Sequence, residues 1–218
     1  MNPPTFSTLT IALADGIAEV RLNRPDKSNA MNEAMWQEIR QAFEWVDATP
    51  AARVAILSGA GKNFCAGIDL SMLASIQQGI ADPDGARSRE ALRRLILDLQ
   101  DCLSSIERCR KPVLAAIQGA CVGGALDMVS CCDMRYATDD AVFAIKEIDL
   151  AMIADVGTLQ RLPHLIGEGL LRELAYTGRN IGATEAEKIG LINQISPSKD
   201  TLTATVCELA KTIAAKSP

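Results

Sequence analysis

Three carboxylates in the second half of the chain are each flanked by apolar residues. Asp127 lies in Gly-Gly-Ala-Leu-Asp-Met-Val-Ser, Glu147 in Ala-Ile-Lys-Glu-Ile-Asp, and Asp155 in Met-Ile-Ala-Asp-Val-Gly. Apolar surroundings raise the pKa of a carboxyl group toward neutral pH, which favours general acid and general base catalysis. Each carboxylate also has a structural alternative. Asp127 could cap a helix or pair locally, and Asp155 could cap the helix after Gly157. Glu147 could form an ion pair with Lys146 or Lys188.

Two glycine-containing turns each follow an apolar run. They are Ser58-Gly-Ala-Gly-Lys-Asn-Phe-Cys-Ala-Gly-Ile-Asp69 and Gln118-Gly-Ala-Cys-Val-Gly-Gly-Ala-Leu-Asp127. The first turn lacks the glycine spacing and the Lys-Ser/Thr ending of a phosphate-binding loop, and Phe64 replaces the last glycine of a dinucleotide fingerprint. Backbone N–H groups at such turns can instead converge on one oxygen and stabilise negative charge that develops there. The structural alternative is that these glycines only permit turns and close helix packing.

The chain is acidic and carries one histidine. Its 22 Lys and Arg residues against 27 Asp and Glu residues give a net charge of −5, which argues against binding of nucleic acid. A lone imidazole is a weak basis for a metal site or a Ser-His-Asp triad, so we expect His164 to be structural or exposed. The seven cysteines contain no Cys-x-x-Cys pair, and we expect reduced, mostly buried thiols.

Composition and hydropathy predict a single globular domain. Of the 218 residues 48% are hydrophobic, which is enough for one stable core. No apolar run approaches the ~18 residues of a membrane span, and the N-terminus lacks a basic region followed by an apolar stretch. We therefore predict a cytoplasmic location, without membrane association.

Strand and helix patterns alternate along the first half of the chain, which predicts an α/β fold. Residues 7–14 and 16–23 alternate apolar and polar positions around Asp15-Gly16, which predicts a β-hairpin. Asn32 is a candidate N-cap for a helix that ends before Pro50. Further expected elements are buried strands at 54–57 and 113–117, a polar surface excursion or lid at 71–89, and a long amphipathic helix over 92–106.

The second half of the chain begins with the second glycine turn. We expect a short apolar helix to about Cys132, followed by β-like stretches at 134–137 and 142–145. The remainder is expected to be mostly helical. The last helix carries Leu202, Val206, Leu209 and Ile213 on one face.

The turns and carboxylates belong to a longer pattern of motifs. It runs through Val20-Arg-Leu-Asn-Arg-Pro-Asp-Lys-Ser-Asn-Ala30, the two glycine turns, Lys146-Glu-Ile-Asp149 and Ala154-Asp-Val-Gly-Thr-Leu-Gln-Arg-Leu-Pro163. In these motifs the chain resembles the crotonase superfamily of enoyl-CoA hydratases and isomerases, and most of all its Δ3,5-Δ2,4-dienoyl-CoA isomerase branch. The resemblance covers most of the chain and implies a spiral of ββα units with a helical C-terminal part.

The resemblance implies an acyl-CoA thioester substrate, with CoA as part of the substrate and no metal or other cofactor. The N–H groups of Ile68 and Gly124 would hold the thioester oxygen as it becomes enolate-like. The implied oxyanion-hole and substrate-binding residues are Ala66, Gly67, Ile68, Asp69, Leu70 and Gly124, and the implied CoA-binding residues are Lys27, Asn29 and Ala30.

The carboxylates distinguish the branches of the superfamily. Hydratases of the family usually have two glutamates at the positions of Asp127 and Glu147, and a small or apolar residue at the position of Asp155. The triplet therefore implies isomerisation of 3,5-dienoyl-CoA to 2,4-dienoyl-CoA, with Glu147 as the base at C2, Asp155 as the acid at C6, and Asp127 tuning and orienting them. A 2-enoyl-CoA hydratase and a non-catalytic acyl-CoA-binding protein stay open as alternatives.

Two departures from the family pattern affect these expectations. Family chains continue past the helix that ends near Ile213 into helices that cover the acyl pocket and support trimers, whereas this sequence stops at Pro218. We therefore expect a crotonase-like core over 1–196, only the start of a truncated C-terminal helical region over 197–218, and a homotrimer or hexamer where that region is complete. Ala125 and the segment 151–153 differ from a more glycine-rich pattern, so the preferred acyl chain length is expected to differ too.

Overall fold

The N-terminal hairpin is formed as predicted. The computed structural model describes residues 2–217, without the side chain of Gln77. Strands β1 (Leu9–Ala14) and β2 (Ile17–Leu22) pair antiparallel around the turn at Asp15 and Gly16. The hairpin forms one edge of a larger sheet.

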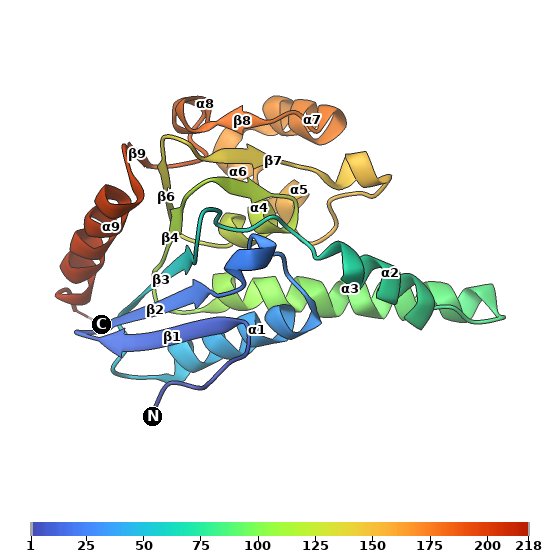
Figure 1. Cartoon of the computed structure of the whole chain (residues 1–218), viewed down its shortest axis with the longest axis horizontal. Coiled ribbons are helices and arrows are strands. Elements are labelled where there is room, and N and C mark those ends of the chain that lie inside the picture. Colours follow the sequence, from blue (N-terminus) through green and yellow to red (C-terminus); the bar gives the residue numbers. More distant parts are fainter. Residues whose placement is uncertain (1, 218) are drawn as a thin grey trace.

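A six-stranded sheet organises the molecule (Figure 1). Its order is β1-β2-β3-β4-β6-β9, and all pairs beyond the hairpin are parallel. The added strands are β3 (Val54–Gly59), β4 (Val113–Ile117), β6 (Met134–Thr138) and β9 (Gln194–Ser196). Both faces of β3 and β4 are covered, which explains why their sequences are continuous apolar runs.

A second, three-stranded sheet leads away from the first. It consists of β5 (Ala120–Val122), β7 (Val142–Ala144) and β8 (Ile181–Gly182) in the order β5-β7-β8. Because β5 follows β4 after only Gln118 and Gly119, the chain passes directly from one sheet to the other. The second glycine turn thus lies where the two sheets meet.

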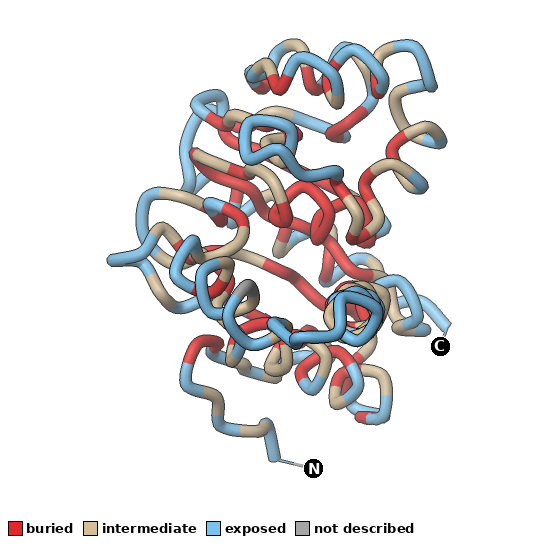
Figure 2. The backbone as a smooth tube through the Cα atoms, turned by 90° about the vertical axis from the view of Figure 1, so that its right-hand side faces the viewer, coloured by how far each residue is buried: buried red, intermediate tan, exposed pale blue. Residues whose placement is uncertain are grey.

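Two long helices cover one face of the main sheet, and a third covers the other. Helix α1 (Glu33–Ala48) packs beside α3 (Gly85–Arg108), and the side chain of Asn32 caps α1 by accepting the N–H of Met35, as predicted. Helix α9 (Lys199–Ala214) lies on the opposite face, where Leu202, Val206 and Ala210 pack against apolar side chains of β3, β4 and β6. The buried residues gather in the interior between these layers (Figure 2).

The segment 71–89, predicted as a polar surface excursion or lid, is largely helical. It contains helix α2 (Leu70–Gly79) and the first turn of α3, separated by a short turn at Asp82-Pro-Asp84. The Asp69 and Asp84 side chains cap these helices by accepting the N–H groups of Ser71 and Ala86. Helix α2 and the first part of α3 extend away from the body of the molecule (Figure 1). The residues between and at the start of these helices, 81–87, are exposed to solvent, which explains their polar composition.

The remaining short elements surround the second sheet. They are η1 (Pro25–Lys27), α4 (Gly124–Ser130), η2 (Glu147–Leu150), α5 (Thr158–Arg161), α6 (Pro163–Ile166), α7 (Glu168–Thr177) and α8 (Ala183–Lys188). All seven cysteines are free thiols, five of them buried, and His164 is exposed, both as expected. Within residues 2–217, none of the helices combines the length and the apolar character that crossing a membrane requires.

Candidate active site

The two glycine turns meet side by side, although about 50 residues separate them in the sequence. Cys65 and Cys121 pair as an isolated parallel bridge, with the N–H of Cys65 donating to the Ala120 carbonyl at 3.0 Å. Gly67 has a φ of +87°, and a Cβ there would lie 2.7 Å from the carbonyl oxygen of Val122. Only glycine permits this approach of the first turn to the second.

Two backbone N–H groups remain unpaired where the turns meet. Within residues 2–217, no hydrogen-bond acceptor faces the N–H of Ile68 or that of Gly124, whereas the N–H groups of Ala66 and Gly123 donate to Ser28 and Ala144. Ile68 and Gly124 both line the same cavity. The turns therefore present two available donors to one space, which is the arrangement needed to hold an oxyanion.

That cavity has a volume of about 350 Å³ and an apolar wall with few polar groups. Such a composition is typical of small-molecule sites. The lining residues are Ala30, Trp36, Ala66, Gly67, Ile68, Leu70, Leu99, Gly123, Gly124, Lys146, Glu147, Leu150, Met152, Asp155 and Val156.

Asp127 lies behind the cavity wall, on α4. Its side chain is fully buried, and Oδ1 accepts the N–H of Thr158 at 2.6 Å. Oδ2 has no partner within the described residues. Burial raises the pKa of Asp127 to about 6, although the hydrogen bond from Thr158 acts in the opposite direction. Asp127 thus accepts the N–H of Thr158, the first residue of α5.

Glu147 begins η2 and points back to the second turn. A Cβ at Gly123 would lie 3.3 Å from its Oε1, while its Oε2 has no hydrogen-bond partner within the described residues. Burial, and then the nearby charge of Asp127, raise the pKa of Glu147 to about 7. Lys146 does not pair with it, since that ammonium group contacts Asp149 at 3.1 Å and the carbonyl of Gly178 at 2.6 Å. A carboxyl group that titrates near 7 suits proton transfer at neutral pH.

Asp155, the third predicted carboxylate, is half-buried. It lines the cavity, and burial raises its pKa as well. Its backbone carbonyl accepts a hydrogen bond from Gln100 Nε2 of α3 at 2.5 Å. The charge of Asp155 also raises the pKa values of Asp127 and Glu147, so the structure brings all three predicted carboxylates into one electrostatic group.

The three predicted CoA-binding residues of the loop around Lys27 differ in their position relative to the cavity. Lys27 is exposed and Ala30 lines the cavity. Asn29 is fully buried, and its amide donates to the carbonyls of Ala60, Asn63 and Phe64. Its side chain therefore holds the loop against the first glycine turn and does not face a ligand.

The segment that follows Ile68 is also fixed from outside the cavity. Asp69 pairs with Arg24 at 2.9 Å in addition to capping α2, and Leu70 is exposed at the cavity edge. Arg24 lies in the first family motif but was not among the predicted site residues. It also missed Trp36, which lines the cavity and whose Nε1–H has no partner within the described residues. Apolar helix periodicity gives no sign that this ring reaches the site.

Comparison with known proteins identifies the family of the chain. Residues 13–218 match the family model described as "Enoyl-CoA hydratase/isomerase". The peroxisomal Δ(3,5)-Δ(2,4)-dienoyl-CoA isomerase of Arabidopsis thaliana is 47% identical over 100% of this chain and 80% of its own length. The mitochondrial enzyme of that name from Homo sapiens is 46% identical over 93% of this chain, which spans 62% of the human protein.

Solved structures show the same fold. An enoyl-CoA hydratase/isomerase from Xanthobacter autotrophicus Py2 matches with a TM-score of 0.88 at 30% identity, over 98% of this chain and 76% of that one. A putative crotonase from Legionella pneumophila matches with a TM-score of 0.87 at 27% identity, over 98% and 79%. The expected crotonase-like fold and the similarity to the dienoyl-CoA isomerase branch are thereby confirmed. The chain belongs to the enoyl-CoA hydratase/isomerase family.

Proposed function

We propose that the protein isomerises a 3,5-dienoyl-CoA thioester to the 2,4-dienoyl-CoA thioester. The observation that carries this proposal is the group of three carboxylates whose pKa values burial raises, Asp127, Glu147 and Asp155, beside two backbone N–H groups without a partner in the described residues. The relatives named dienoyl-CoA isomerase support the same reaction. The reaction needs no cofactor besides the CoA of the substrate, because it moves one proton and neither oxidises nor reduces the acyl chain.

The first step removes a proton from C2. Glu147 is the base, because it lines the cavity and its raised pKa lets it accept a proton near pH 7. The electron pair of the C2–H bond delocalises toward the thioester oxygen, which gains negative charge. The N–H groups of Ile68 and Gly124 stabilise that charge, and one such donor is worth roughly 3 kcal/mol of activation free energy.

The second step returns a proton at C6. The dienolate re-forms double bonds at C2–C3 and C4–C5 while C6 takes a proton from Asp155. Asp155 suits this role because burial raises its pKa and so favours its protonated form. Asp127 has no access to the cavity lining and acts on the other two carboxylates through its charge and through the 155–158 loop.

The CoA moiety is proposed to lie along the loop of Lys27 and Ala30, at the mouth of the cavity. The exposed Lys27 ammonium group can meet a phosphate there, which makes the net acidic charge no obstacle. The proposed homotrimer or hexamer and the cytoplasmic location remain predictions. The names of the two relatives place those proteins in peroxisomes and mitochondria.

The test is a direct assay of isomerisation. Purified protein is mixed with a 3,5-dienoyl-CoA, and the ultraviolet absorbance of the conjugated 2,4-dienoyl thioester is followed, with hydration of crotonyl-CoA measured in parallel. We expect rapid diene formation that Glu147→Gln and Asp155→Asn each reduce by about 10²- to 10⁴-fold. Hydration alone would replace the proposal with a 2-enoyl-CoA hydratase. Binding of CoA esters without either reaction would replace it with an acyl-CoA-binding protein.

A further inference from the structure

Three polar side chains on one face of α3 hold the loop that carries Asp155. They are Gln100, Ser104 and Glu107, whose spacing places them above one another on the helix. Gln100 bonds to the Asp155 carbonyl at 2.5 Å, and the other two accept hydrogen bonds from Arg161. The Arg161–Glu107 ion pair is 2.8 Å long, and the Arg161 side chain is only 15% exposed.

The Arg161 guanidinium is folded back against its own loop. Its Nη1 lies 3.4 Å from the Val156 carbonyl oxygen. A Cβ at Gly157 would lie 1.7 Å from the same nitrogen, and Gly157 has a φ of +126°. Glycine at this position therefore leaves the space that the guanidinium fills.

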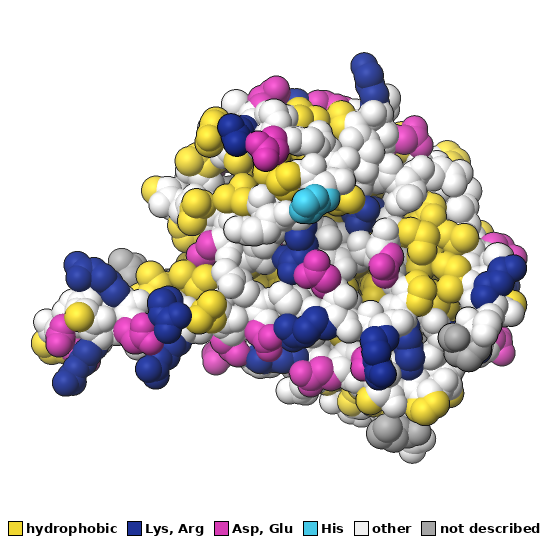
Figure 3. All heavy atoms as spheres, turned by 180° about the vertical axis from the view of Figure 1, so that it is seen from behind, with side chains coloured by type: hydrophobic (Ala, Val, Ile, Leu, Met, Phe, Trp, Pro, Cys, Tyr) yellow, Lys and Arg dark blue, Asp and Glu magenta, His cyan; other side chains and the backbone are white. Residues whose placement is uncertain are grey.

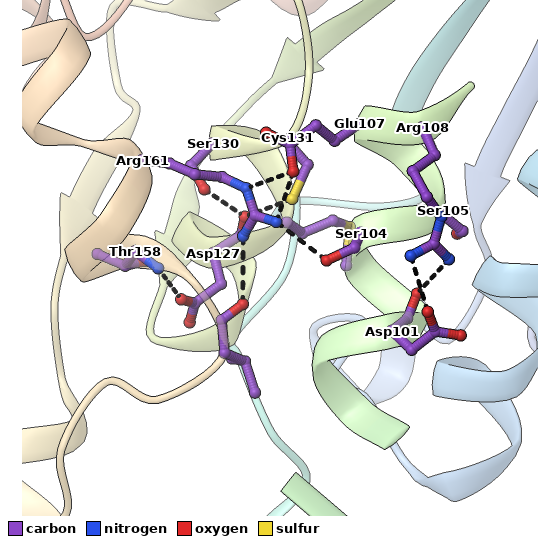
Figure 4. A network of polar contacts seen from close by, with 12 residues as sticks. Asp101, Ser104, Ser105, Glu107, Arg108, Asp127, Ser130, Cys131, Thr158 and Arg161 are labelled. Carbon is purple, nitrogen blue, oxygen red and sulfur yellow. Dashed lines mark hydrogen bonds and ion pairs between the residues drawn. The ribbon is translucent and has the colours of Figure 1, made fainter. Parts of the chain in front are cut away.

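The carboxylates lie on the other side of this loop. Thr158, one residue after Gly157, donates its N–H to Asp127, and Figure 4 shows Arg161 reaching from α5 to Glu107 and Ser104 with Asp127 close by. Val156 lines both the catalytic cavity and an open groove of about 410 Å³ behind it. Figure 3 shows that side of the molecule, where cationic and acidic side chains gather beside the histidine.

Against the effect of burial, the positive charge of Arg161 lowers the pKa of Asp127. The groups that face Asp127 come from several elements: Glu147 of η2, Asp155 of the loop, Arg161 of α5, and the thiols of Cys121 in β5 and Cys131 after α4. Burial raises the thiol pKa values, so both thiols are uncharged at neutral pH. Glu107 of α3 offsets part of the Arg161 charge.

We propose that Arg161 is a positioning residue that, paired with Glu107, fixes the 155–158 loop against α3 and keeps a positive charge behind Asp127. The proposal rests on the proposed function, because Asp155 and Asp127 are carboxylates of that reaction. Its electrostatic part concerns the pKa of Asp127 alone, and that part can be tested without catalysis.

The first test is titration of the aspartate carboxyl carbons by NMR. In Arg161→Gln the pKa of Asp127 should rise, because a nearby positive charge is lost, and in Glu107→Gln it should fall, because that charge is no longer offset. Arg161→Lys should leave it near the wild-type value. An unchanged pKa in Arg161→Gln, or shifts of the same sign in Arg161→Gln and Glu107→Gln, would overturn the proposal. This readout stands even if the wild-type protein proves to have no isomerase activity.

The second test separates kcat from KM. Arg161→Gln should lower kcat for the 3,5-dienoyl-CoA roughly 10- to 100-fold with little change in KM, because misplacement of Asp155 affects the chemical step more than binding. Gly157→Ala should do the same without removing any charge, since its methyl group displaces the guanidinium. Arg161→Lys should restore only part of kcat, because an ammonium group cannot reproduce the planar fork.

The matched control is Arg110→Gln. Arg110 also forms an ion pair between elements, at 2.7 Å with Asp47, but it has no contact with the 155–158 loop. It should keep the wild-type kcat. Wild-type kcat in both Arg161→Gln and Gly157→Ala would overturn the positioning role, whereas absence of isomerisation in the wild-type protein would count against the proposed function only.

Discussion

Within residues 2–217, no cation is bound directly to the carboxyl group of Glu147 or to that of Asp127. Each has one oxygen without a hydrogen-bond partner in the described residues. Burial raises the pKa of Glu147 to about 7 and that of Asp127 to about 6. Uncompensated burial costs folding free energy at any pH where the groups are charged. Such a cost in stability is expected at a functional site, where the chemistry needs the buried carboxyl group.

The first prediction is that Glu147→Gln stabilises the protein increasingly as pH rises. A carboxyl group whose pKa is higher in the folded than in the unfolded state loses stability as pH rises from its unfolded pKa, 4.5, to its folded pKa, about 7, and no further above that. The full shift corresponds to at most about 3 kcal/mol. Urea denaturation of wild type and variant from pH 5 to pH 8 should show a difference that grows with pH.

The control for this measurement is Glu44→Gln, because Glu44 is exposed on α1. Its difference from the wild type should stay constant over the same range. A constant difference for Glu147→Gln as well would mean that this carboxylate is solvated in the folded protein. The base role would then lose its electrostatic support.

At the scale of elements, the site depends on the contact between the two glycine turns. Gly67→Ala should separate them, because its methyl group would meet the Val122 carbonyl at 2.7 Å and because φ is +87° there. The N–H groups of Ile68 and Gly124 would then no longer converge. We expect kcat for the dienoyl-CoA to fall roughly 10- to 100-fold, with a smaller effect on binding of a saturated acyl-CoA measured by calorimetry.

Gly169→Ala is the matched control for this second prediction. Gly169 lies in α7, and a Cβ there meets nothing within 4 Å. The substitution should preserve kcat and stabilise the helix by about 0.5–1 kcal/mol. Wild-type kcat in Gly67→Ala would show that the reaction does not need the two donors at their present spacing.

Element patterns explain why some of this structure could be predicted. The hairpin, α1 with its Asn32 cap, and the two strands before the glycine turns follow from local periodicity and capping, which act over a few residues. The helical form of 71–89 was missed because Asp82-Pro-Asp-Gly85 marks a turn, and because the residues around that turn, 81–87, are all exposed and show no apolar periodicity.

The site could be predicted only in part for the same reason. Family motifs indicated the three carboxylates and both donors, and the structure brings those residues together. Arg161 lies in the same family motif as Asp155, but nothing local to Arg161, Gln100 or Trp36 indicates which groups their side chains contact. Gln100 and Arg161 reach the site because α3 packs against a segment 55 to 57 residues away in the sequence, and Trp36 reaches it because α1 packs against the two turns.

At the scale of the whole molecule, α9 closes the sheet on the face opposite to α1 and α3. Its apolar residues share one buried cluster with β3, β4 and β6, and Leu202 is 1% exposed. The predicted boundary between 1–196 and 197–218 falls just before this helix. Such packing favours one cooperative unit, because the sheet residues under α9 would otherwise face water.

The last prediction is that Leu202→Ala lowers the stability of the entire chain by about 2–5 kcal/mol, the usual cost of a cavity at a buried leucine. The two tryptophans, Trp36 and Trp45, both lie in α1 on the other face of the sheet, so their fluorescence reports unfolding at a distance from α9. In urea, the fluorescence and far-ultraviolet circular dichroism transitions should shift together. Leu97→Ala, at a side chain 47% exposed on α3, should change neither by more than about 0.5 kcal/mol. Loss of helical signal before the fluorescence transition would instead mean that α9 unfolds alone, and the boundary at 196 would then separate two units of different stability.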